Sequence, residues 1–169
     1  MSPISWTSPR TWLAGEDPAA SVYNQHIRDN FKAIGDAWTS YSPAWAAATT
    51  NPVIGNGTKT GAYIQVGKLI MFRINITAGS TTTWGSGVYT FSYPPFAPLD
   101  SGANSNPGIT GFFFDNSGGP KPYGGFGIGQ TSTTFRVVMA NADSYMSHLF
   151  PVAGAVSDKI NLAGTYEAA

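Results

Sequence analysis

The spacing of apolar residues divides the chain near residue 41. Between residues 20 and 41, side chains that could form the contact face, or seam, of a coiled coil recur at alternating steps of four and three. This spacing is the seven-residue repeat of a coiled coil. After residue 41, apolar and polar residues alternate with the period of two that half-buried β-strands show. The pattern therefore predicts two domains, an N-terminal arm and helix over residues 1–41 and a β-rich head over residues 42–169.

The N-terminal domain is expected to begin as an extended arm. Prolines and the alternation around two tryptophans disfavour a helix over residues 1–16. Asp17 and Pro18 then form the pair typical of a helix start, an N-cap followed by proline in the first turn. These signals predict a single helix over residues 18–38.

One face of this helix has the spacing of an oligomer seam. Its candidate oligomerisation residues are Asn24, Ile27, Phe31, Ile34 and Trp38. An asparagine in a seam favours one register and one number of strands, which supports a short trimeric coiled coil. Against this, three heptads are few, and Gly35 inside a helix costs about 1 kcal/mol relative to alanine. An amphipathic helix that packs on its own head therefore remains an alternative.

The head reads as an antiparallel all-β domain. Residues 63–66 and 69–76 flank Gly67-Lys68, which is typical of a tight hairpin turn. Alternation in the second strand places Phe72, Ile74 and Ile76 on one face and Arg73 and Asn75 on the other. Further candidate strands are residues 42–49, 88–93, 109–114, 126–129, 133–139 and 159–167. Short strands separated by polar loops predict a mainly β fold, an antiparallel β-sandwich or jelly roll.

Composition narrows the classes of partner. Only 11% of residues are charged, and nine basic side chains balance nine acidic ones, which argues against a nucleic-acid partner. The absence of cysteine rules out disulfides and thiolate metal sites. No apolar stretch has the length of a membrane span, and the N-terminus lacks the pattern of a signal peptide. We expect a soluble, unsecreted protein with no membrane insertion.

The sequence offers little catalytic chemistry. By the heptad count His26 lies on the outer side of the helix, and His148 lies in a loop, so neither belongs to a metal-ligand pattern. No nucleophile elbow is present, and the carboxylates of the head lack a recognisable catalytic context. We expect no enzyme activity, no cofactor and no metal. A glycan depolymerase using Asp115 or Asp143 is a minor alternative.

Two polar loops of the head are candidate recognition surfaces. The segment 80–86 carries Trp84, and the segment 115–123 combines amide, charged and aromatic groups. Aromatic faces with small hydrogen-bonding neighbours are typical of adaptable binding surfaces. The candidate receptor-contact residues are Trp84, Asp115, Asn116, Lys121 and Tyr123. The alternative is that Trp84 and Tyr123 fold back onto the head or into a subunit contact.

A resemblance extends from the N-terminal segment to the last residues of the chain. Residues 12–16 and 23–31, with Asn-x-x-Ile-Arg-Asp-Asn at 24–30, resemble the N-terminal segment of tail and fibre proteins of actinobacterial siphophages. Residues 41–68 and 162–168 resemble the β-rich heads of the same group. Residues 98–157 match nothing that we can name.

The resemblance implies a virion structural protein, commonly a homotrimer. Its arm, with Trp6 and Trp12, would attach to other virion proteins, and its head would project and contact glycan on the host surface. The main alternative is an architectural virion protein, such as a capsid decoration, head fibre or tail component, without receptor binding. A binding module of non-viral origin is a further alternative.

Overall fold

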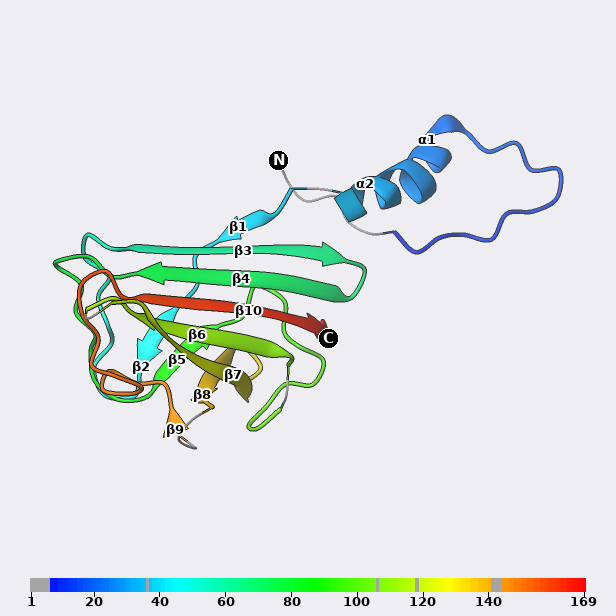
Figure 1. Cartoon of the computed structure of the whole chain (residues 1–169). Helices are drawn as coiled ribbons and strands as arrows, with labels where there is room; N and C mark the ends of the chain where they lie inside the picture. The colour runs from blue at the N-terminus through cyan, green and yellow to red at the C-terminus, as the bar shows by residue number, and fades with distance from the viewer. Residues whose placement is uncertain (1–6, 36, 106, 118, 141–143) are drawn as a thin grey trace.

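The structure is a computed structural model that describes residues 7–35, 37–105, 107–117, 119–140 and 144–169. An arm and one helical segment extend from a β head (Figure 1). The helical segment comprises α1 (Ala20–Tyr23), the π-helical turn η1 (Asn24–Arg28) and α2 (Asp29–Gly35). The arm runs alongside this segment and turns back to enter it at α1 (Figure 1). The predicted combination of an arm, one helix and a mainly β antiparallel head is confirmed.

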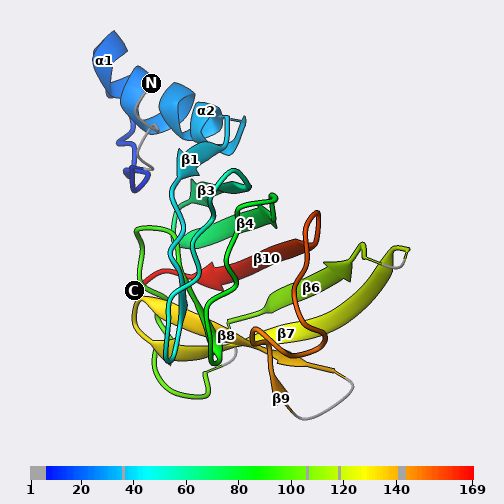
Figure 2. The ribbon, with the colours of Figure 1, turned by 90° about the vertical axis from the view of Figure 1, so that its left-hand side faces the viewer.

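All strands of the head belong to one antiparallel sheet. The strand order is β1-β3-β4-β10-β6-β7-β8-β5-β2, and β9 pairs with β8. The bounds are β1 Thr39–Tyr41, β2 Trp45–Ala47, β3 Thr58–Val66, β4 Leu69–Thr77, β5 Tyr89–Ser92, β6 Ile109–Asp115, β7 Lys121–Thr131, β8 Thr134–Met139, β9 Ser144–Tyr145 and β10 Lys159–Glu167. The sheet curls on itself, so that its inward side chains meet in a single core (Figures 1 and 2).

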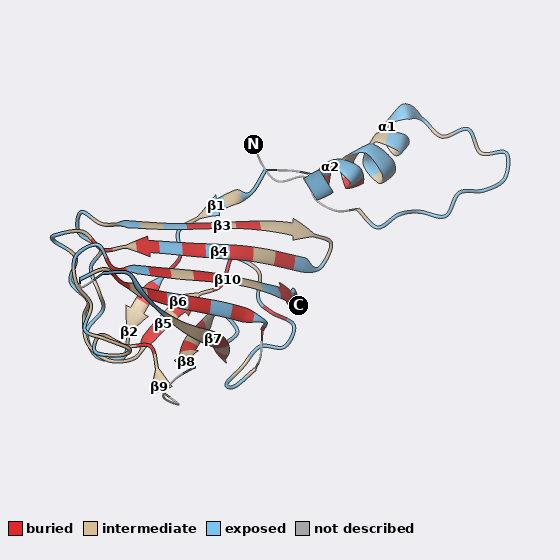
Figure 3. Ribbon diagram, in the orientation of Figure 1, coloured by how far each residue is buried: buried red, intermediate tan, exposed pale blue. Residues whose placement is uncertain are grey.

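Strict alternation explains why the predicted strands form where they do. In β4 the side chains of Phe72, Ile74 and Ile76 are buried, whereas Arg73 and Asn75 are exposed, as predicted. The same alternation is visible along β6 and β10 (Figure 3). The predicted hairpin is also present, because Val66 pairs with Leu69 across a turn in which Gly67 has φ of 59°. A positive φ at this position favours glycine.

The predicted strand over residues 42–49 is confirmed only for Trp45–Ala47, which form β2. Before it lies β1, which pairs with β3 at one edge of the sheet, whereas β2 pairs with β5 at the opposite edge. Pro43 lies between them and has no N–H with which to continue a ladder. Its ring packs beside Gly61, where an added Cβ would lie 2.9 Å from Pro43 Cδ. The segment before residue 42 thus contributes β1 to the sheet of the head.

The helix differs from its prediction at both ends. Ala19, with ψ of 150° and no side-chain cap, occupies the N-cap position, so the expected cap at Asp17 and first-turn role of Pro18 are wrong. The helix ends at Gly35, three residues before Trp38. Trp38 leaves the helical face because its ring packs against Arg73 of β4, with the guanidinium carbon 4.8 Å from the ring centroid. It is therefore not part of a continuous seam.

Candidate assembly surface

A buried asparagine fixes the arm to the helix. Asn30 is 6% exposed, and its side-chain Oδ1 accepts a hydrogen bond from the backbone N–H of Thr7 at 2.9 Å. Its Nδ2 donates to the carbonyl oxygens of Thr7 at 2.8 Å and of His26 at 3.2 Å. The amide thus satisfies both backbone groups of Thr7, as a neighbouring β-strand would. This pairing holds the start of the arm against the middle of the helical segment.

A second anchor joins the far end of the arm to the start of the helix. The rings of Trp12 and Tyr23 stack with their centroids 5.3 Å apart and an interplanar angle of 19°. The Arg10 guanidinium lies 5.0 Å from the centroid of the Trp12 ring and forms an ion pair with Glu16. Glu16 also accepts a hydrogen bond from the backbone N–H of Leu13 at 3.1 Å. The arm and helix therefore form one locally ordered unit.

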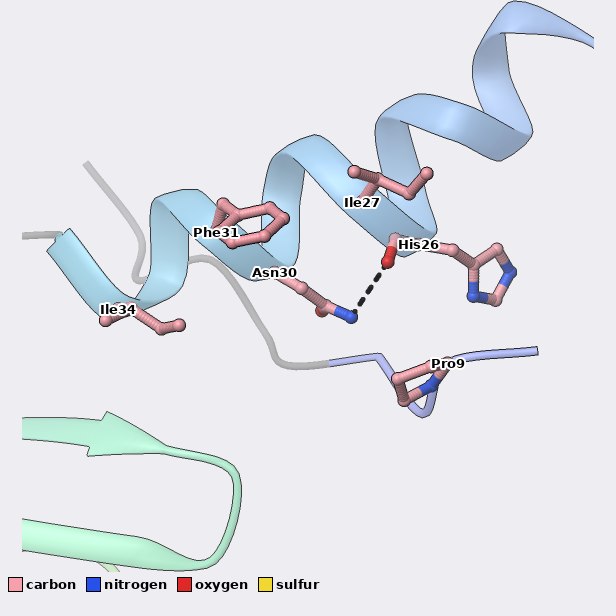
Figure 4. A pocket seen from close by; sticks show the side chains of 6 residues that line it. All are labelled: Pro9, His26, Ile27, Asn30, Phe31 and Ile34. Carbon is pink, nitrogen blue, oxygen red and sulfur yellow. Dashed lines mark hydrogen bonds between the residues drawn. The ribbon is translucent and has the colours of Figure 1, made fainter. Parts of the chain in front are cut away.

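A shallow apolar groove lies on this unit. Its cavity volume is about 200 Å³, and it is lined by Pro9, His26, Ile27, Asn30, Phe31 and Ile34. Figure 4 shows Ile27, Phe31 and Ile34 presented from successive turns above the arm residue Pro9. Their side chains are strongly solvent-exposed, with 72% exposure for Phe31, 53% for Ile34 and 40% for Ile27.

His26 adds an unusual polar feature to the groove. Its Nδ1 atom is buried, and within the described ranges it has no hydrogen-bond partner. The expectation that His26 lies on the outer side of the helix is wrong, because its side chain lines the groove beside Pro9 (Figure 4). Buried polar atoms are nearly always paired, so a partner at this atom would have to come from outside the described structure.

The structure brings together three of the five predicted seam residues. Ile27, Phe31 and Ile34 line the groove, whereas Asn24 does not. Asn24 opens the π-helical turn, which adds a residue to the local period and rotates what precedes it away from the heptad face. Of the two predicted attachment residues, Trp12 is engaged within the arm and helix, and Trp6 lies outside the described residues.

The predicted receptor loops are held largely by internal contacts. Trp84 packs on the core, with its ring centroid 5.4 Å from Trp45 and 5.7 Å from Phe113. The ring of Tyr123 is half-buried and also packs against the core cluster. Lys121, by contrast, is exposed.

The carboxylates of the head support turns. Asp115 Oδ1 accepts hydrogen bonds from the hydroxyl and the backbone N–H of Ser117, and these bonds, the first above all, hold the pKa of Asp115 below its ordinary value. Asp158 is fully buried and accepts from the backbone N–H groups of Asn116 at 2.8 Å and Ala155 at 2.7 Å. Asn116 in turn donates to the carbonyl of Ser157. These groups fix the β6–β7 turn onto the loop before β10.

Among the residues that the structure describes, no group of three or more histidine, aspartate or glutamate side chains could hold a metal ion. Asp143, the other carboxylate of the minor catalytic alternative, lies outside the described residues.

Within the described ranges, no helix is both long and apolar enough to cross a membrane. Sequence analysis did not identify Asn30 as the residue that holds the arm, although its position beside the apolar face of an amphipathic helix is a recognisable signal.

Comparison of the chain with protein-family models, curated proteins and solved structures finds no match.

Proposed function

We propose that this chain is a bacteriophage virion structural protein, a fibre or spike whose arm and helix assemble on the particle while its β head projects. The observation that carries the proposal is the row of exposed apolar side chains formed by Ile27, Phe31 and Ile34. Apolar rows of this kind on a surface helix mark contacts with another protein. These three side chains take no part in the core of the head, because none of them belongs to the core cluster.

In this proposal, three copies meet through the helices in a short coiled coil, and the curled sheet of each copy serves as a sandwich-like or jelly-roll head. A closed three-fold arrangement would cover the same row on each copy. The buried Nδ1 of His26 would then find its hydrogen-bond partner across the interface. The arm, fixed by Asn30, would present its outer side to the particle, and the head would contact glycan on the host surface.

One observation favours the architectural alternative, a virion protein without receptor binding. The polar groups of Asp115 and Asn116 and the ring of Trp84 are committed to contacts within the head. The loops expected to touch a receptor are therefore less available than their composition indicates. Binding of the fluorescently labelled full chain to actinobacterial cells separates the two functions, because an architectural protein would show none.

The assembly proposal is tested by the solution mass of the full chain measured by light scattering. We expect a mass three times that of the 17.8 kDa chain. Phe31→Asp should give monomers, since it places an unpaired charge in each helix contact. Leu149→Asp is the matched control, because Leu149 is 64% exposed but lies in a loop of the head. A monomeric wild type, or a Phe31→Asp protein that remains trimeric, would contradict the assembly.

A further inference from the structure

A groove crosses the outer face of the head, on the side of the sheet away from the core. Its cavity volume is about 320 Å³, and Trp38, Met71, Gly108, Thr110, Ala163 and Thr165 contribute to its lining. A second hollow of about 310 Å³ is lined in part by Leu99, Asp100, Gly108, Thr165 and Glu167. Gly108 and Thr165 line both, so the two hollows adjoin. Each is within the size range of ligand pockets.

One wall of the groove is an indole ring in a fixed position. Trp38 is 40% exposed, and the guanidinium of Arg73 lies over its ring. This cation–π contact orients the indole before any ligand arrives. Trp38 also immediately precedes β1, which pairs with β3, so the backbone that carries the indole is joined to the sheet. A preoriented aromatic surface binds a flat apolar face with little loss of side-chain entropy.

The floor of the groove is formed by small and polar residues. Register places Ala163 of β10 between Arg73 of β4 and Thr110 of β6 on the outer face. Ala163 and Gly108 leave room above the sheet, and both Thr110 and Thr165 are exposed. The Thr110 hydroxyl lies 3.4 Å from the carbonyl of Ala163, and it keeps accepting capacity toward solvent.

The adjoining hollow is acidic. Asp100 and Glu167 are both exposed there, and Glu167 lies 3.8 Å from Lys68 Nζ. Carboxylate oxygens are strong acceptors for hydroxyl donors. They also repel anions, and the guanidinium of Arg73, which could attract them, is held over the Trp38 ring. The charge of the groove therefore favours a neutral ligand rich in hydroxyl groups over an acidic one.

We infer that this groove binds a neutral oligosaccharide, with one sugar ring stacked on Trp38 and its hydroxyl groups bound by Thr110, Thr165 and the two carboxylates. The inference rests on the proposed contact of the head with host glycan, and it gives that contact a location. The location differs from the loops that sequence analysis favoured. Those loops use Trp84 and Asp115 to hold the head together, whereas Trp38 and Thr165 face an open groove.

The test uses the full chain and the indole N–H signals of its five tryptophans in two-dimensional NMR. Neutral pentose and hexose disaccharides are added one at a time at millimolar concentration, and glucuronic acid and sialic acid serve as acidic probes. We expect at least one neutral sugar to shift the Trp38 signal, assigned from its loss in Trp38→Phe, while the acidic probes shift nothing. Trp38→Ala and Thr165→Val should each lower the affinity, the former by about tenfold or more.

Phe126→Ala is the matched control, because Phe126 is an exposed aromatic residue on β7 but does not line the groove. It should bind sugar as the wild type does. Shifts at Trp84 instead of Trp38 would overturn this location while leaving glycan recognition intact. The absence of any shift would overturn the inference, whereas the trimer mass and cell adsorption measured for the proposed function would be unaffected.

Discussion

Asn30 pairs with Thr7 through both of its side-chain amide atoms, although the two residues are 23 positions apart in the chain. The neighbouring residue, Phe31, is 72% exposed, whereas Asn30 is 6% exposed. Adjacent positions of one helix therefore face different partners. The Asn30 side holds the chain's own arm, and the Phe31 side is left for another molecule, which allows the arm and the assembly surface to be altered separately.

Asn30→Asp should release the arm without unfolding the head. A carboxylate can accept from the Thr7 N–H but cannot donate to the Thr7 and His26 carbonyls, so two hydrogen bonds are lost. Only the bond to Thr7 holds the arm, so at about 1 kcal/mol for one bond, opening of the arm should increase roughly 5-fold. The rate of tryptic cleavage after Arg10 measures this opening. Gln25→Glu makes the same chemical change at an exposed helix position, and equal cleavage rates in the two variants would contradict the role of Asn30.

Trp84→Ala should lower stability and leave sugar binding by the folded protein unchanged. The Trp84 ring packs edge-on against Trp45 and closely against Gly154, so its removal leaves a cavity at the margin of the core. We expect a loss of about 3 kcal/mol in the free energy of unfolding, measured by urea denaturation. Trp84→Phe should recover part of this loss. If Trp84→Ala unfolds like the wild type but adsorbs poorly to cells, Trp84 is a recognition residue after all.

Local pattern was sufficient to predict the regular part of the fold. The predicted strand over residues 159–167 is β10, and the hairpin about Gly67 is present, because burial on one face of a strand enforces a period of two. The separate strands β1 (Thr39–Tyr41) and β2 (Trp45–Ala47), in place of one strand over residues 42–49, were not predictable in this way. They depend on the chain crossing between opposite edges of the sheet, and no short-range signal encodes that crossing.

The site was less predictable than the fold because its geometry depends on distant partners. Ile27, Phe31 and Ile34 follow from helical periodicity, and the structure places all three on one groove. Trp38 fits the same period, but Arg73, 35 residues later, holds it on the head. From the sequence, Asp115 is expected to be a loop carboxylate without an internal partner, whereas in the structure Ser117 donates a hydrogen bond to it. Sequence spacing predicts which residues share a face, but not which polar partners will be brought to them.

Ser117→Ala should weaken the head in acid. The hydrogen bonds from Ser117, the side-chain bond first, favour the ionised form of Asp115 and lower its pKa below 3.8. A lowered pKa in the folded state contributes stability that is complete above the ordinary pKa and is lost as the pH falls through the lowered one. Without the hydroxyl, the pKa of Asp115 should rise toward 3.8, and acid unfolding should begin at higher pH.

The pKa of Asp115 can be measured by NMR titration of its carboxyl carbon, and the pH at which acid unfolding begins can be measured by fluorescence. Lys121→Gln is the comparison, because the charge of Lys121 contributes least to the lowered pKa. It should therefore raise the pKa by less than Ser117→Ala does. The reverse order would show that charge, and not the hydrogen bond, controls Asp115.

The stability of the head should respond differently to loss of the hydroxyl at two neighbouring tyrosines. The rings of Tyr93 and Tyr166 have centroids 5.3 Å apart, and both residues are buried. The Tyr166 hydroxyl donates to the carbonyl of Phe96 at 2.8 Å, whereas that of Tyr93 is buried with no partner in the described part of the chain. Burial raises the pKa of Tyr93 to about 12, as expected for a phenol that lacks water.

Tyr166→Phe should thus cost about 1 kcal/mol in the free energy of unfolding, since it leaves the Phe96 carbonyl unpaired. Tyr93→Phe removes an unsatisfied hydroxyl and should be neutral or slightly stabilising. Urea denaturation of the two variants beside the wild type gives both values, and the shared ring geometry makes each the control for the other. A loss in Tyr93→Phe as large as that in Tyr166→Phe would show that a buried water pairs with the Tyr93 hydroxyl, because a hydroxyl without a partner has no hydrogen bond to lose.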